Sequence, residues 1–248
     1  DWMRVGFIHG VMNTDNMTIS GETIDYGPCA FMDQYHPKTV FSSIDKLGRY
    51  AYSNQPPITK WNLTRFAECL IPLIDKNENT SIKIATNVID NFQNIYEKKW
   101  LNMMRDKLGL FGEDKNDRKL IDDLLNWMEK NKIDYTNIFC HLMDIKIDNN
   151  TYKDKTFLTW FDEWKKRSQL NNSSKEKQIE LMKKNNPIVV PRNHKVEEAL
   201  TEANNGSLEG MNKLNDILKN PYSNQEDIAE YQVPAPTTNE KYQTFCGT

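Results

Sequence analysis

The chain has 248 residues, of which 38% are hydrophobic and 27% charged, and its formal net charge is −3. This length can bury a sizeable core in one large domain or two small ones. The small negative charge gives no basis for a nucleic-acid partner. No apolar run approaches the roughly 20 residues that cross a bilayer, and no signal-peptide pattern is present. We therefore expect a cytoplasmic protein that binds neither nucleic acid nor a membrane.

The first quarter of the chain predicts loops more than helices. The apolar stretch from Trp2 to Ile8 predicts the end of a buried helix. From Asn13 to Gln55 the chain is rich in Gly, Pro, Asp and Asn, which predicts irregular structure with short β-like pieces near residues 18–24. Because functional side chains tend to lie on loops held by a rigid scaffold, we interpret this region as the active-site segment.

Apolar residues at helical spacing predict helices in most of the remaining chain. The first covers about residues 58–74, and the second runs from Ser81, as its N-cap, to Leu108, with Gly109 as its end. A third follows the apolar stripe at residues 120–128, and the short connections predict that these three helices pack antiparallel.

Weaker patterns predict the later elements. Asp134 or Thr136 could cap a helix that reaches Ile145, and from Ala229 we expect an extended, mobile tail unless it docks. The tryptophans of the middle region recur at helical spacing, which favours burial in the core over ligand stacking. Further helices are expected at residues 157–164, 176–184, 196–206 and 208–218.

One motif near the N-terminus carries the chemistry. The run His9 to Asn16, followed by Asp25-Tyr26-Gly27, aligns with the protein-kinase catalytic loop and its D-F-G motif. His9 falls on the kinase His, Asn16 on the metal-binding Asn, and Asp25 on the metal-binding Asp. The catalytic Asp is replaced by Val11, and a carboxylate reappears at Asp15. The pattern therefore predicts a kinase-like magnesium site with a relocated base.

The residue types suit this chemistry. Mg²⁺ takes oxygen ligands, commonly one or two from the protein and the rest from phosphate and water, and Asn16 and Asp25 could supply that number. Asp15 could then orient or deprotonate an attacking hydroxyl. The alternative is that Asp and Asn residues in this string only form turns, which their local hydrogen bonds favour.

Longer motifs, found together and in order, resemble the selenoprotein O family of pseudokinase-fold protein adenylyltransferases. The resemblance covers the whole chain. It is carried by RVGFIHGVMNTDN (4–16), TIDYGP (23–28), FMDQY (31–35), GRYAYSNQP (48–56), WNLTRFAE (61–68), NP (186–187), PRNH (191–194), NPY (220–222) and FCGT (245–248).

The resemblance implies transfer of AMP from ATP to Ser, Thr or Tyr hydroxyls of proteins. It implies that Asp15 accepts the proton, that Asn16 and Asp25 hold Mg²⁺, and that Asp25 thereby contacts bound ATP. Two alternatives stay open: kinase-type phosphoryl transfer, and a non-catalytic pseudokinase or helical binding module. The expected partners are ATP, protein substrates and the remainder of the same protein.

The resemblance also implies a mainly α fold, a protein-kinase-like C-lobe with a helical C-terminal extension. No G-x-G-x-x-G loop or strand-borne lysine occurs in the chain, so we expect the N-lobe to be missing and the isolated chain to be inactive. The expected division is a catalytic and metal-binding loop segment (1–57), a helical C-lobe core (58–170), and a helical extension with a mobile tail (171–248).

Two further predictions concern cysteines and arginines. Cys246 is third from the end, a position at which members of the resembled family can carry selenocysteine. The resemblance suggests that Cys246 forms a reversible disulfide with Cys29. The alternative is that these two cysteines are unrelated free thiols. Arg49 and Arg192 could meet either phosphate or a carboxylate. The carboxylates of Asp33 and Asp45 are expected to be solvated.

Overall fold

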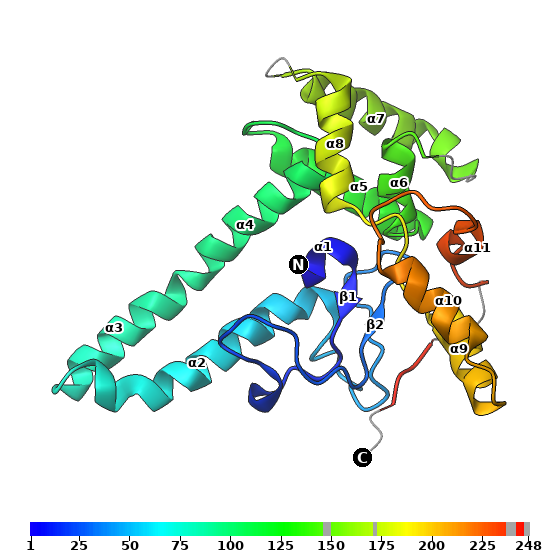
Figure 1. Ribbon diagram of the computed structural model, residues 1–248. Coiled ribbons are helices and arrows are strands. Elements are labelled where there is room, and N and C mark those ends of the chain that lie inside the picture. Colours follow the sequence, from blue (N-terminus) through cyan, green and yellow to red (C-terminus); the bar gives the residue numbers. More distant parts are fainter. Residues whose placement is uncertain (146–149, 171–172, 237–241, 246–248) are drawn as a thin grey trace. The chain divides into compact units, whose positions relative to one another are not determined.

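The computed structural model describes residues 1–145, 150–170, 173–236 and 242–245 and is mainly helical, as expected (Figure 1). The chain forms two compact units and passes between them more than once. Unit 1 comprises residues 1–7, 31–36 and 101–242, and unit 2 comprises residues 8–30, 37–100 and 243–248. No helix among the described residues is both long and apolar enough to cross a membrane.

Unit 2 contains the candidate catalytic loop and a long helical hairpin. The loop includes the 3₁₀ turn η1 (Thr14–Asn16). A second 3₁₀ turn, η2 (Tyr52–Asn54), leads into α2 (Gln55–Ile74), whose first turn holds two prolines, as is common where backbone N–H groups have no helical partner. Helix α2 packs against α3 (Glu78–Asp90), and α4 (Phe92–Lys107) begins in this unit.

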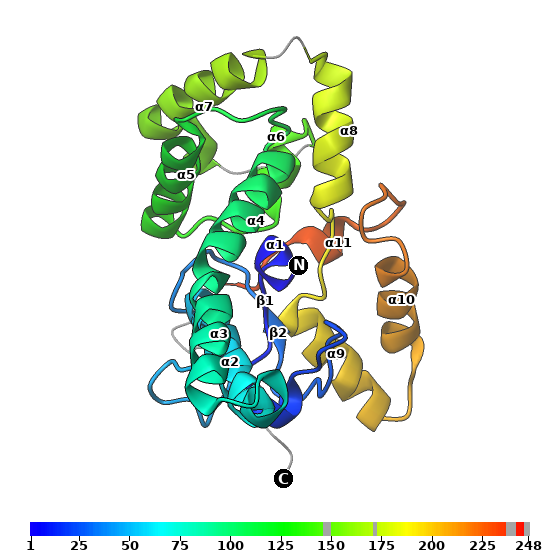
Figure 2. The same ribbon diagram turned by 90° about the vertical axis from the view of Figure 1, so that its left-hand side faces the viewer.

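Unit 1 is built from short amphipathic helices. Helix α5 packs against α7, and α9 packs against α10, as Figure 2 shows. The helices of this unit, besides the end of α4, are α1 (Trp2–Val5), α5 (Asp117–Asn131), α6 (Asn137–Leu142), α7 (Lys155–Ser168), α8 (Lys175–Asn185), α9 (Asn193–Asn204), α10 (Glu209–Leu218) and α11 (Ala229–Gln232), with the 3₁₀ turn η3 (Asn150–Lys153).

The core of unit 1 confirms the prediction for three tryptophans, whereas Trp100, in α4, is only half-buried. Trp127, Trp160 and Trp164 are buried, and two of their indole N–H groups reach backbone carbonyls. Trp160 donates to Leu120 O at 2.8 Å, and Trp164 donates to Leu108 O at 2.9 Å. Because a buried indole N–H needs a partner, these bonds fix how α7 packs against its neighbours.

The expected buried helix from Trp2 to Ile8 is wrong in extent. Helix α1 ends at Val5, because Gly6 takes a left-handed conformation with φ of 74°. Phe7 and Ile8 then form strand β1, which pairs with β2 (Ala30–Phe31) in a two-stranded sheet.

The predicted helix from Ser81 to Leu108 is two helices. Asn77, and not Ser81, caps the first one, since its side-chain oxygen accepts the Thr80 N–H at 3.1 Å. Ser81 lies inside α3, buried, and donates to Asp75 O. Asn91 separates α3 from α4, whereas Gly109, with φ of 66°, follows the end of α4 as predicted.

The tail after residue 228 is docked where it is described. Residues Ala229–Gln232 form α11, in which Tyr231 is buried. The carbonyl oxygen of Gln232 accepts hydrogen bonds from Asn137 Nδ2 and Arg192 Nη2, both at 3.0 Å. Residues Ala229–Gln232 are therefore the docked case that the expectation allowed.

Candidate active site

His9 is the buried centre of the loop that carries the candidate catalytic residues. Its side chain is fully buried, and its backbone N–H donates to Gln55 Oε1 at 3.0 Å. Nδ1 lies 3.4 Å from the Val11 N–H, and Nε2 lies 2.8 Å from Ile24 O. In the tautomer that satisfies both contacts, Nδ1 accepts and Nε2 donates. His9 thus ties its own loop to the segment that carries Asp25, a structural role.

Asp15 and Asn16 are neighbours in η1, and their side chains differ in setting. Asp15 is exposed. Asn16 is half-buried, and its Nδ2 donates to Val11 O at 3.1 Å. With the amide nitrogen held by a carbonyl, the Asn16 oxygen is directed away from that bond and is available as a ligand for a hard cation.

Asp25 is exposed and has an uncommon backbone conformation. Its φ is 53°, in the left-handed region that non-glycine residues seldom adopt. Such conformations persist only when the surroundings hold them, and they cluster at functional sites. Here the hydrogen bond from His9 to the preceding residue, Ile24, provides one such constraint.

A bridge between backbone segments connects these residues. Met17 and Thr23 form an isolated antiparallel β-bridge, which brings the segment leaving Asn16 alongside the segment that enters Asp25. Both segments lie in unit 2. Among the described residues there is no group of three or more His, Cys, Asp or Glu side chains that could hold a metal ion.

Two residues of the motif at 48–56, to which the sequence assigned no role, complete the loop. Tyr50 Oη donates to Asn13 Oδ1 at 2.5 Å, and Gln55 receives the His9 N–H. The motif marks Gln55, but it does not show that its side chain meets His9, 46 residues away, so sequence reasoning assigned it no role. Gly10 has φ of 87°, and a Cβ there would lie 2.6 Å from Pro28 O, so only glycine fits this close approach.

The carboxylates expected to be solvated have partners. Asp45 accepts the backbone N–H groups of Arg49 and Tyr50, both at 2.8 Å, and the Arg49 guanidinium lies 4.9 Å from the ring centroid of Trp61. Asp45 therefore orders a turn. The ring covers one face of the Arg49 guanidinium and does not engage its N–H donors, so the choice between phosphate and carboxylate stays a prediction for Arg49.

Arg192 pairs with carboxylates in unit 1. It is 1% exposed, and its Nη1 lies 2.6 Å from both Asp33 Oδ1 and Asp134 Oδ2. Nη2 donates to Asn137 Oδ1 at 3.2 Å. The expectation that Asp33 is solvated is thus wrong, because a buried guanidinium requires acidic partners.

Cys29 is half-buried, and its Sγ lies 3.7 Å from Tyr26 O. The C-terminal segment reaches this region of unit 2: Thr244 Oγ1 donates to Pro28 O at 2.6 Å, and its backbone N–H donates to Phe41 O at 2.8 Å. Cys246 lies outside the described residues.

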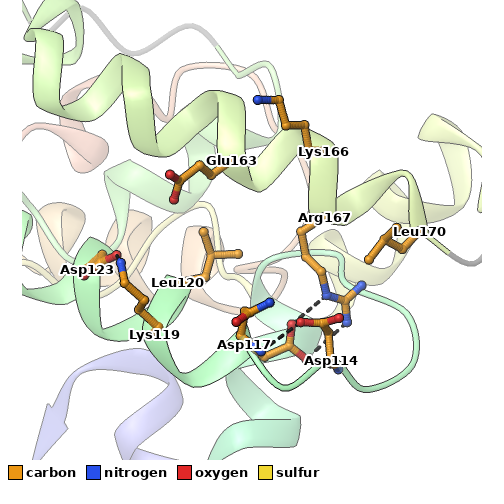
Figure 3. Close-up of a pocket in the computed structure, with 10 residues that line it drawn as sticks. Asp114, Asp117, Lys119, Leu120, Asp123, Glu163, Lys166, Arg167 and Leu170 are labelled. Carbon is orange, nitrogen blue, oxygen red and sulfur yellow. Dashed lines mark hydrogen bonds and ion pairs between the residues drawn. The ribbon is translucent and has the colours of Figure 1, made fainter.

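Unit 1 contains a hollow of about 430 Å³, lined by residues of α5, α7 and the turn before α5. Figure 3 shows the side chains that line it. Its charged groups are largely paired. Asp117 is buried between Arg167, at 2.6 Å, and Arg105, at 2.7 Å, while Lys119 pairs with Asp123 at 2.6 Å. We assign this hollow a structural role, since paired charges at its wall hold the helices together.

Comparisons with known proteins identify the family to which the chain belongs. A family model described as "Protein adenylyltransferase SelO" matches residues 1–219. The chain is 64% identical over 249 residues to a "Protein nucleotidyltransferase YdiU" of Pelagibacter ubique (strain HTCC1062), and it covers 52% of that protein. Proteins of the same description from Bacillus cereus (strain AH820) and Nitrosococcus oceani are 52% and 48% identical, each with 51% covered. All of this chain is matched each time, so it spans about half the length of these relatives.

Proposed function

Because the chain belongs to the SelO family of protein adenylyltransferases, we propose that it supplies the catalytic and metal-binding loop of an enzyme that transfers AMP from ATP to Ser, Thr or Tyr hydroxyls of proteins. The observation that carries the proposal is the link between the two halves of the loop. His9 and the Met17–Thr23 bridge hold η1, with Asp15 and Asn16, beside the segment of Asp25.

In the proposed reaction, Asp15 accepts the proton of the substrate hydroxyl as its oxygen attacks the α-phosphorus of ATP. The bond from that phosphorus to the bridging oxygen breaks, and pyrophosphate leaves. Asn16 and Asp25 would hold Mg²⁺, which neutralises charge on the phosphates. The exposure of Asp15 and Asp25 supports these roles, because both carboxylates are open to an incoming substrate.

The proposal extends to the architecture of the whole protein. Residues 1–57 form the loop segment, 58–170 the core of a kinase-like C-lobe, and 171–248 a helical extension. The nucleotide-cradling N-lobe would lie in the half of the family's polypeptide that this chain does not match. On this basis, the 248 residues alone do not transfer AMP.

Radiolabelled ATP tests the reaction in a protein of the relatives' full length that carries this chain. We expect protein labelling from ATP labelled at the α-phosphate and none from the γ-phosphate. Labelling from the γ-phosphate would instead establish phosphoryl transfer. Asp15→Asn should abolish transfer while leaving Mg-ATP binding, whereas Asp25→Asn should weaken both. Transfer that survives Asp15→Asn would refute the base assignment, and the absence of nucleotide binding by the wild type would favour a scaffold.

We also propose that Cys29 and Cys246 form a reversible disulfide. Thr244 is hydrogen-bonded to Pro28, the residue before Cys29, and Cys246 follows two residues later. Two residues span at most about 7 Å, which is comparable with the separation of disulfide-bonded Cα atoms. Each thiol would lose its proton, and a small-molecule disulfide would take up the two electrons.

A further inference from the structure

Helix α2 exposes large apolar side chains along one side. Leu63, Phe66 and Leu73 are 37%, 44% and 81% exposed, and they follow at i, i+3 and i+10, which places them on one stripe of the helix. We call these three residues the α2 apolar stripe. An exposed apolar stripe on a helix of this length marks a surface that another segment covers.

A hollow of about 290 Å³ adjoins this stripe. Leu63 and Phe66 line it from α2, and Met17 and Ile19 line it from the loop after η1. Thr14, the neighbour of Asp15, and Cys69 also line it. The hollow therefore connects the α2 apolar stripe to the candidate catalytic loop, and both belong to unit 2.

Asn62 provides an independent sign that the hollow takes a partner. It is 6% exposed and lines the hollow. Its Nδ2 donates to Met12 O at 2.9 Å, which fixes the amide orientation, whereas its Oδ1 is buried and has no hydrogen-bond partner among the described residues. An unsatisfied buried acceptor is unfavourable, so a segment that brings an N–H or O–H donor would gain this bond on docking.

On the same helix, the ring of Trp61 is covered by two arginine side chains of this chain. The guanidinium groups of Arg49 and Arg65 lie 4.9 Å and 5.4 Å from its ring centroid. Among the described residues no cation covers the ring of Phe66, which is 44% exposed and lines the hollow. The α2 apolar stripe is thus a separate surface.

We infer that the α2 apolar stripe and its hollow are the docking surface for the half of the family's polypeptide that this chain does not match. That half exists in the relatives, of which this chain covers 51–52%. A permanent partner suits the surface, because permanent interfaces are the more apolar ones, whereas transient ones resemble the ordinary protein surface. The docked segment would place an apolar side chain in the hollow and a donor on Asn62 Oδ1, beside the catalytic loop.

The inference does not rest on nucleotide chemistry, so its test uses binding and stability alone. The first readout is alkylation of Cys69, an exposed thiol that lines the hollow. We compare the isolated chain with a fused protein, in which the unmatched half of the Pelagibacter ubique relative precedes it. Cys69 should react at least about tenfold more slowly in the fused protein, because docking excludes the reagent. Equal rates in the two proteins would overturn the inference.

The second readout is a pair of matched substitutions. Phe66→Asp should lower the melting temperature of the fused protein and restore alkylation of Cys69, yet leave the isolated chain nearly unchanged. Leu158→Asp is the control, since Leu158 on α7 is similarly exposed, at 47%. It should have the same effect in both proteins. An equal effect of Phe66→Asp in both proteins would contradict the inference.

A third measurement separates the other occupants. If the isolated chain sediments as a dimer whose Cys69 is protected, the surface binds a second copy and the inference fails. If protection of Cys69 in the fused protein appears only when a protein substrate is added, the surface is a substrate site and the inference also fails.

Discussion

The imidazole Nε2 of His9 lies 2.8 Å from the carbonyl oxygen of Ile24, so a fully buried side chain fixes the residue that precedes Asp25. This hydrogen bond is one of the contacts that hold the candidate catalytic residues in place. Asp15 and Asn16 lie six and seven residues after His9, and Asp25 follows directly after its acceptor.

His9→Phe removes this bond while keeping a buried ring. We expect AMP transfer by the full-length protein to fall by about ten- to a hundredfold, since a displacement of about 1 Å in a reacting group can cost that much. The rate is measured with α-labelled ATP. His9→Gln, whose amide can still donate to Ile24 O, should retain more activity than His9→Phe. Equal activity of the two variants would contradict a positioning role.

Asp117→Asn tests the buried ion pairs of unit 1. Burial alone would raise the pKa of Asp117, but hydrogen bonds from Arg167, the Asp114 backbone and Arg105 outweigh it and lower the pKa below its ordinary value. The substitution should reduce the free energy of unfolding by about 3 kcal/mol, because two guanidinium groups lose their anion. Urea denaturation measures this loss.

The same carboxylate gives a pH dependence. A lowered pKa in the folded state means that the stabilisation is complete above the unfolded pKa of about 3.9 and is lost as the pH falls through the folded value. Asp117→Asn should flatten this acid limb of the stability profile. Asp122→Asn is the control: its exposed pair with Arg118 should contribute at most about 1 kcal/mol.

Gly109→Ala tests a close approach after α4. Gly109 has φ of 66°, and a Cβ there would lie 2.9 Å from Met182 Cγ and 3.0 Å from Gln178 O. Gly206→Ala is the matched control, because Gly206 has φ of 90° but no atom within 4 Å of its Cβ position. We expect a loss of about 1 kcal/mol for Gly206→Ala from conformation alone, and a larger loss for Gly109→Ala. Equal shifts in thermal unfolding would exclude the steric contribution.

Asn77→Ala tests the cap of α3. The side-chain bond to the Thr80 N–H should make its removal cost about 1 kcal/mol. Asn116 occupies the same position at α5 without a side-chain capping bond. Asn116→Ala should therefore change the unfolding free energy by only a few tenths of a kcal/mol. Chemical denaturation of both variants measures the difference.

Formation of the proposed Cys29–Cys246 disulfide should accelerate with pH. Burial raises the pKa of Cys29, and the carboxylate of Asp25 adds to this, so little thiolate is present at neutral pH. Thr244→Val should slow oxidation, because it removes the bond that holds the tail at Pro28. Mass spectrometry of non-reduced peptides follows the reaction. Free thiols at both positions after oxidation of the wild type would refute the pairing.

The spacing of apolar residues predicted the helices well where one side of the helix is buried. In α5, Leu120, Ile121, Leu124 and Met128 are all buried, so the stripe that predicted the helix is also its packing surface. In α2 the apolar residues predicted the helix equally well, although the α2 apolar stripe remains exposed. The spacing of apolar residues identifies the apolar side of a helix, but it carries no information on which segment covers that side.

Caps and long-range pairs could not be predicted in this way. Asn77 and Ser81 are both good capping residues, and the choice between them depends on a single hydrogen bond. Arg192 is 159 residues from Asp33 and 58 from Asp134, so only the folded chain reveals that they meet. The motif around His9 identified the candidate site, whereas the contacts of Tyr50 and Gln55 with this loop could not be read from the motif at 48–56 that contains them.

The backbone contacts of Thr244 have a consequence for biosynthesis. Thr244 pairs with Phe41 and Ser43 within unit 2, although the chain reaches it only after all of residues 101–242 in unit 1. During translation, Thr244 therefore emerges from the ribosome about 200 residues after Phe41 and Ser43, the residues with which it pairs. Pro28, next to Cys29, therefore lacks its contact with Thr244 until the residues of unit 1 that lie between them have been translated.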